Sequence, residues 1–327
     1  MGRLTLGGGA PVAANVLRRA LGVLWIADAL VKLALPFGDR PGEQSYEQIM
    51  TAEFGPPGFH HILAWETNLF VSHPFLWWLP AAVELGIGIW LVLRPASRRA
   101  LAFSAGWALV VWVAGEGLGG LAAGGSLLAG YPGAALLYAV AALVLFPRRE
   151  PRDGALAVAE AGIAGAWSRV AWLALWIGAA FFTALPQTGT NSMPFMLTIN
   201  ESEAPGPLHA LDAAEQRWLT VGHTNLLGFA VAAACPAVGF MIFLGWLPRL
   251  FLSLSILIVL AAWIGAQNLG GILTGSSTDV GTGPIWILLA LAFWPAAMTR
   301  ANRDGEAAPA AAQDSTATGT STTARSA

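Results

Sequence analysis

The chain has 327 residues, of which 56% are hydrophobic and only 11% charged, and its mean hydropathy is +0.61. Soluble domains carry about 25% charged residues, so this composition excludes an ordinary soluble class and predicts an integral membrane protein. The formal net charge of −2 gives no reason to expect a nucleic-acid partner. The single cysteine, Cys235, excludes an intramolecular disulfide and a Cys-x-x-Cys motif.

Apolar segments recur along the chain and predict an all-α, polytopic protein with eight transmembrane helices. We expect these helices at 16–36, 76–94, 100–118, 131–147, 168–186, 224–246, 249–267 and 282–298. The long connections after the first and fifth helices contain Phe59–Phe70 and Leu208–Leu219, whose patterns indicate short amphipathic helices at the membrane surface. The segment 300–327 is rich in Ala, Ser and Thr and is expected to be a disordered tail.

Basic residues gather on one side of the predicted spans. The positive-inside rule therefore predicts a plasma-membrane protein in contact with the lipid bilayer, with both its N- and C-termini in the cytoplasm. The opposite side holds only Arg40 and Arg217 among the arginines. The cytoplasmic set is Arg18, Arg19, Arg94, Arg98, Arg99, Arg148, Arg149, Arg152, Arg169, Arg249, Arg300 and Arg303.

The sequence contains an internal repeat. The stretch from Trp112 to Ser126 aligns with the stretch from Trp263 to Ser277 at an offset of 151 residues, and the same offset relates Arg18 to Arg169. An even number of helices in each copy gives both copies the same orientation in the membrane, which is the parallel arrangement of repeats. We therefore expect two tandem four-helix repeats, at 1–153 and 154–299, followed by a cytoplasmic tail at 300–327.

Four ionisable residues lie within or at the ends of the predicted spans, and all belong to the first repeat: Asp28, Lys32, Glu84 and Glu116. A charge inside the bilayer is costly, so each is a candidate for ligand binding or proton handling. Asp28 and Lys32 are four residues apart and are expected to pair on one helix face. The alternative is that Lys32 reaches toward the outer surface, with Asp28 as a structural partner.

Glu116 stands in the glycine-rich sequence Gly115-Glu-Gly-Leu-Gly-Gly120, where the backbone can leave helical geometry. Non-helical backbone at membrane depth requires a surrounding of protein or water, so we expect a polar pocket here. The alternative is that the carboxylate only caps backbone amides of its own turn. The second repeat has Gln267 and Asn268 at this place, which keep the polarity without the charge.

Histidines on the outer side offer weak metal ligands. His60, His61, His73 and His223 are the candidates, but no pair has a diagnostic spacing. Interfacial histidines are common, and we therefore predict no metal site.

Each predicted unit has a first helix, a long connection and then three closely spaced helices, and in the first unit the first helix ends in Asp28-Ala-Leu-Val-Lys32. This unit resembles the DoxX-like and MauE-like family of small membrane proteins. Members typically end the first helix in a Gly-x-x-Lys segment, whereas this chain has Ala29 at the glycine position, and its second copy lacks the lysine. The resemblance implies a redox-linked role, with quinone as the implied cofactor and a membrane or exported redox protein as the implied partner.

Three functions follow from these observations. The first is a membrane accessory protein of a redox system that binds quinone or an exported redox partner near the outer face. The second is a small-solute or proton-coupled carrier, and the third is a structural assembly factor of a membrane complex. No enzyme active site can be identified in the sequence, so enzymatic activity is not expected.

Overall fold

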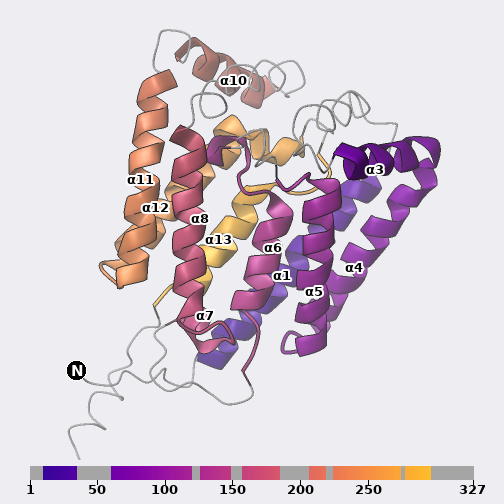
Figure 1. Ribbon diagram of the computed structural model, residues 1–327, viewed down its shortest axis with the longest axis horizontal. Coiled ribbons are helices and arrows are strands. Elements are labelled where there is room, and N and C mark those ends of the chain that lie inside the picture. The colour runs from indigo at the N-terminus through magenta and orange to yellow at the C-terminus, as the bar shows by residue number, and fades with distance from the viewer. Residues whose placement is uncertain are drawn as a thin grey trace, which may run out of the picture.

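The computed structural model describes residues 10–34, 60–119, 126–148, 157–184, 206–218, 224–273 and 277–295. Within these ranges the chain is all-helical and contains no strand (Figure 1). This confirms the all-α fold class. The predicted tail at 300–327 lies outside the described residues.

Helices are present in each of the eight segments that the apolar pattern predicts. In the first half they are α1 (Ala10–Ala34), α4 (Trp78–Leu93), α5 (Arg98–Val110) and α6 (Ala134–Val144). In the second half they are α8 (Trp167–Ala184), α11 (Thr224–Leu244), α12 (Pro248–Ala261) and α13 (Thr282–Ala292). The last helix of each half is shorter than expected. α6 begins after its N-cap Gly133 and ends at Val144, whereas α13 begins at Thr282 as expected and ends at Ala292.

Shorter helices lie at the two ends of the bundle. The expected surface helices are α3 (His60–Ser72) and α10 (Gly206–Trp218), both at the end opposite the short helix α7 (Val158–Ala161) (Figure 1). The 3-10 turn η2 (Pro74–Trp77) precedes α4, and another, η5 (Leu127–Ala129), precedes α6.

Three helical segments are long and apolar enough to cross a membrane: Phe75–Leu93, Trp167–Ala184 and Pro248–Ala266. Three shorter apolar segments accompany them, at Ala134–Val144, Gly228–Leu244 and Thr282–Ala292. Large apolar side chains also face outward, including Leu93 at 73% and Phe229 at 75% exposure. An apolar exterior of this extent suits contact with lipid, and the fold is that of a membrane-associated helical protein.

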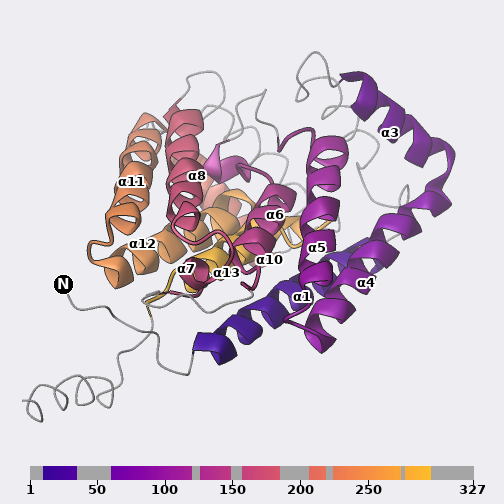
Figure 2. The same cartoon turned by 60° about the horizontal axis from the view of Figure 1, so that its bottom comes forward.

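The helices pack as two groups joined in the middle. α1 lies along α4 and α8 lies along α11, while α13 contacts α12, α6 and α1 (Figures 1 and 2). The apolar core runs through both groups, and its largest fully buried side chains include Trp172, Trp176, Trp286 and Tyr138. The central helices α6 and α13 therefore hold the two halves together.

Two π-helical turns end the helices that precede the glycine-rich segments. η3 (Val111–Gly115) follows α5 and η7 (Ala262–Ala266) follows α12, at the same 151-residue offset as the sequence repeat. Positive φ angles follow both turns, at Gly117, Leu118 and Gly119 in one half and at Asn268, Leu269 and Gly270 in the other, where the short 3-10 segment η8 (Asn268–Gly271) lies. The prediction that the backbone leaves helical geometry at Glu116 is confirmed.

Two glycines let α1 and α4 approach closely. A Cβ added at Gly22 would lie 2.8 Å from the Gly88 carbonyl oxygen, and one at Gly88 would lie 2.6 Å from the Gly22 oxygen. Small residues at such crossings allow backbone-to-backbone packing between membrane helices. This close approach sets the distance between two helices that carry buried charges.

We expect Gly88→Ala to destabilise the protein by about 1–3 kcal/mol, because the added methyl group forces the two backbones apart. Gly86→Ala on the same helix is the matched control, since a Cβ there would meet nothing within 4 Å. Thermal unfolding of the detergent-solubilised protein measures the difference. Equal unfolding temperatures for the two variants would contradict the close packing of α1 on α4.

Candidate functional site

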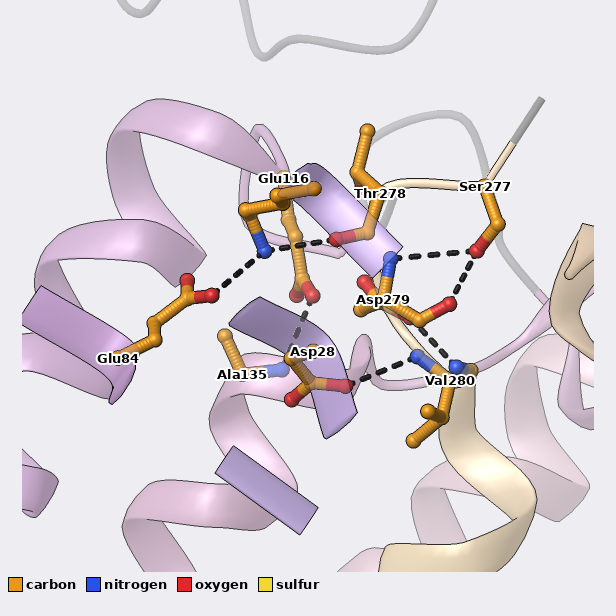
Figure 3. A network of polar contacts seen from close by, with 10 residues as sticks. Asp28, Glu84, Glu116, Ala135, Ser277, Thr278, Asp279 and Val280 are labelled. Atoms are coloured by element: carbon orange, nitrogen blue, oxygen red, sulfur yellow. Dashed lines mark hydrogen bonds and ion pairs between the residues drawn. The ribbon is translucent and has the colours of Figure 1, made fainter. Parts of the chain in front are cut away.

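A cavity of about 20 Å³ lies where α1, α4, α6 and the end of α5 meet. Its polar lining consists of Asp28, Lys32, Glu84, Glu116, Tyr138 and Asp279, with Trp25, Val111, Ala134 and Ala135 completing the wall. A space of this size holds about one water molecule. All four ionisable residues singled out in the sequence therefore converge on one small cavity, part of which is drawn in Figure 3.

Lys32 forms a buried ion pair with Glu84. The Lys32 Nζ lies 2.9 Å from Glu84 Oε2, and the same ammonium group donates to the Thr278 carbonyl at 2.7 Å. Lys32 is 7% exposed and Glu84 is 1% exposed. The ion pair described for Lys32 is with Glu84 of α4, and its expected pairing with Asp28 stays a prediction, although the two charges lie close enough to attract each other. The alternative, a lysine that reaches the outer surface, fails because the side chain is buried.

Asp28 is stabilised by the backbone of the second half. Its Oδ1 accepts a hydrogen bond from the Val280 amide at 2.9 Å, in a segment that precedes α13 (Figure 3). Asp28 is 2% exposed, so this backbone donor replaces water as the partner of its carboxylate. The residues from Thr278 to Val280 thus contact both Lys32 and Asp28, and they cover the cavity of the first half.

Asp279 belongs to the same covering segment. Its Oδ1 accepts from the Gly281 amide at 2.5 Å, directly before α13, and its backbone nitrogen is bonded to Ser277 Oγ at 3.2 Å. A carboxylate at a helix N-terminus is stabilised by the unpaired amides there. Asp279 also lines the cavity, so it adds a fourth carboxylate to the site.

Glu116 combines the two roles that the sequence left open. Its Oε1 accepts from the Ala135 amide at 2.9 Å, which caps the first turn of α6 (Figure 3). Its Oε2 is buried and has no hydrogen-bond partner among the described residues. Gly133 leaves room for this carboxylate, because a Cβ at Gly133 would overlap Oε2. One oxygen of Glu116 is therefore a cap and the other is available to a ligand.

The cavity has an excess of acidic groups. Asp28, Glu84, Glu116 and Asp279 face it, whereas Lys32 is the only basic side chain among its described lining residues. Uncompensated charge in a low-dielectric interior is strongly unfavourable. The arrangement therefore favours binding of protons or of a small cation.

Gln267 and Asn268 lie in a separate place, at the second glycine-rich turn. Gln267 Nε2 donates to the Leu127 carbonyl at 3.1 Å, and its Oε1 accepts from Thr282 Oγ1 at 2.9 Å. Asn268 Nδ2 donates to Asp212 Oδ2 of α10 at 3.0 Å. The two amides therefore join elements of the second half to each other and to η5, and they do not line the cavity.

The sequence analysis did not single out Tyr138, Thr278 or Asp279 as site residues. Tyr138 is 2% exposed and lies in the otherwise apolar helix α6. Its hydroxyl is the feature of that helix from which a polar neighbour could have been predicted. Thr278 and Asp279 lie in a connection whose position depends on how the two halves pack. Apolar periodicity carries no information about that contact.

Two of the four histidine candidates, His61 and His73, have described side chains. His61 and His73 are exposed, while the side chain of His60 and residue His223 lie outside what is described. The described part of the chain contains no group of three His, Cys, Asp or Glu residues placed to hold a metal ion.

Comparison of the chain with protein-family models, with curated proteins and with solved structures found no significant match.

Replacing Lys32 alone should be more harmful than replacing both members of its pair. Lys32→Met leaves Glu84 as a buried charge without its cation, which costs about 3–5 kcal/mol. The double variant Lys32→Met/Glu84→Gln removes both charges and should recover much of the lost stability. Thermal unfolding and the amount of protein in the membrane fraction measure this coupling. Additive losses in the double variant would show that the pair is not energetically coupled.

The docking of α10 should depend on pH. Burial, together with the neighbouring Asp212, raises the pKa of Glu215 above its usual value. The protonated form is therefore favoured in the docked helix, so this stabilisation is present at low pH and is lost as the pH rises through the raised pKa. We expect amide hydrogen exchange in α10, corrected for the intrinsic effect of pH, to accelerate over that range.

Glu215→Gln should remove this dependence on pH, and exchange in α3 serves as the internal control. An unchanged pH dependence in the variant would contradict the role of Glu215 in docking α10.

Proposed function

We propose that this protein is a proton-coupled carrier of a small solute in the plasma membrane, and that the buried carboxylates around Lys32 take up the proton. The observation that carries the proposal is Glu116 Oε2, a buried carboxylate oxygen with no described partner, facing a water-sized cavity. Intramembrane acidic residues that line a cavity are typical of proton relays in transporters.

The proposed membrane topology has eight spans arranged as two tandem parallel repeats, with both termini in the cytoplasm. The two π-helical turns at a common offset support this arrangement, as do the terminal helices α6 and α13, each of 11 residues. Equivalent tryptophans add to it, because Trp112 Nε1 donates to the Pro132 carbonyl and Trp263 Nε1 to the Val280 carbonyl. In both cases the acceptor immediately precedes the glycine N-cap of the final helix.

The packing of the two halves supports a gated site. The segment from Thr278 to Val280 contacts the buried charges of α1 through two backbone groups, the Thr278 carbonyl and the Val280 amide. Movement of one repeat against the other would withdraw both contacts at once. Carriers built from repeats open and close their sites by such relative movement.

The redox-accessory role stays a prediction that rests on the sequence resemblance. A quinone ring needs far more space than the 20 Å³ of this cavity, since pockets for organic ligands usually measure about 300–1,000 Å³. The same limit means that the solute of the proposed carrier is of about the size of a water molecule, such as a small ion. A purely structural assembly factor has no need of four carboxylates around one lysine. The charge arrangement therefore favours the carrier over both alternatives.

Reconstitution into liposomes that contain a pH-sensitive dye tests the proposal. Under an imposed pH gradient, the intact protein should move protons faster than protein-free liposomes do. Glu116→Gln should reduce this movement about tenfold or more, because the amide can still accept from Ala135 but cannot exchange a proton. Glu215→Gln is the matched control, a half-buried carboxylate of α10 outside the cavity.

Full proton movement in Glu116→Gln would reduce Glu116 to a helix cap and remove the basis of the proposal. A loss of movement in Glu215→Gln equal to that in Glu116→Gln would also contradict it, because the effect would then not belong to the cavity.

A further inference from the structure

We propose that the cavity binds a small monovalent cation, with sodium as its expected ligand, in competition with protons. This inference rests on the proposed function, because it concerns the ion that occupies the same carboxylates. The carboxylic acid of Glu116 would release its proton as the cation binds, so that one positive charge replaces another in the site.

The size and the donor atoms of the cavity point to such an ion. A volume of about 20 Å³ admits one occupant of the size of a water molecule and excludes larger organic cations. The unused atoms that face it are oxygens. Glu116 Oε2 is buried and has no hydrogen-bond partner among the described residues, and the buried hydroxyl of Tyr138 lies beside Asp28. Oxygen ligands are those that hard cations prefer.

The charge of the surrounding groups points in the same direction. Lys32 is already neutralised by Glu84 at 2.9 Å, so its ammonium group does not balance the other carboxylates. Asp28 and Asp279 each accept a hydrogen bond from a backbone amide, which carries no net charge. Glu116 is bonded to the amide of Ala135 only, through Oε1. A single positive charge beside Glu116 would therefore be balanced by the carboxylate of Glu116 itself, with Asp28 and Asp279 in the same lining.

Nothing in the lining favours an anion instead. The basic group of the cavity is Lys32, whose ammonium is bonded to Glu84 and to the Thr278 carbonyl. An anion would also face the carboxylates of Asp28, Glu116 and Asp279 at short range. Tyr138 adds selectivity for a cation over a proton alone, because its hydroxyl oxygen can coordinate an ion but does not take up a proton.

The experiment uses the full-length protein in detergent and sodium chloride as the probe. Sodium chloride should raise the unfolding temperature more than choline chloride does at equal ionic strength, since choline is too large for the cavity. In weakly buffered solution, sodium should also release protons from the protein. Lowering the pH should weaken the sodium response, because protons occupy the same oxygen atoms.

Glu116→Gln should abolish both the sodium-specific stabilisation and the proton release. Tyr138→Phe, which removes only the hydroxyl, should raise the sodium concentration for half-maximal stabilisation by about tenfold or more. Glu215→Gln is the control and should respond as the unmodified protein does.

Equal effects of sodium and choline on the unmodified protein, or a full sodium response in Glu116→Gln, would overturn the inference. Its failure can be distinguished from failure of the proposed function. Proton movement in liposomes without a sodium effect would leave the carrier proposal standing and exclude sodium, whereas absence of both would reject the two together.

Discussion

The buried ion pair between Lys32 and Glu84 determines how the first half of the protein can be assembled. Neither charge can be left alone in an apolar interior, so α1 and α4 must lie close enough for a contact of 2.9 Å. Gly22 and Gly88 provide this proximity by letting the two backbones touch. Once Lys32 is directed at Glu84, Asp28 on the same helix needs another partner. The Val280 amide fulfils that need, and the second half is thereby docked on the first.

The two halves differ in the side chains that they place at corresponding positions. At the 151-residue offset, Asp28 and Lys32 correspond to Ala179 and Thr183, which are 0% and 3% exposed. Around them α8 contributes Trp172 and Trp176 to a buried aromatic cluster with Trp286. The second half therefore gains its stability from apolar packing, and it supplies backbone groups to the charges of the first half. This half also supplies the covering segment, whose Thr278 carbonyl and Val280 amide contact Lys32 and Asp28.

The sequence predicts those parts of this arrangement that depend on local patterns. Apolar runs locate the helices, and the glycines around Glu116 predict the departure from helical geometry after α5. The intramembrane charges also predict which residues of α1, α4 and α5 form the site. The ion pair of Lys32 with Glu84 could not be predicted, because the four-residue spacing points to Asp28 and carries no information about α4. Asp279 could not be predicted either, since an acidic residue in a connection normally faces water. The packing of the two halves places this half-buried residue in the lining of the cavity.

Glu116 and Gln267 show why equivalent positions carry different chemistry. Gln267 donates to the Leu127 carbonyl and accepts from Thr282 Oγ1. A carboxylate could accept the second bond but could not donate the first, because ionised oxygens only accept. Glu116 has one backbone donor, the Ala135 amide, and its other oxygen has no hydrogen-bond partner among the described residues. An amide at position 116 would satisfy the cap equally well and would avoid the cost of burying an acid. The stability of its turn therefore does not explain the carboxylate, whereas the proposed binding of a proton or cation at Oε2 requires it.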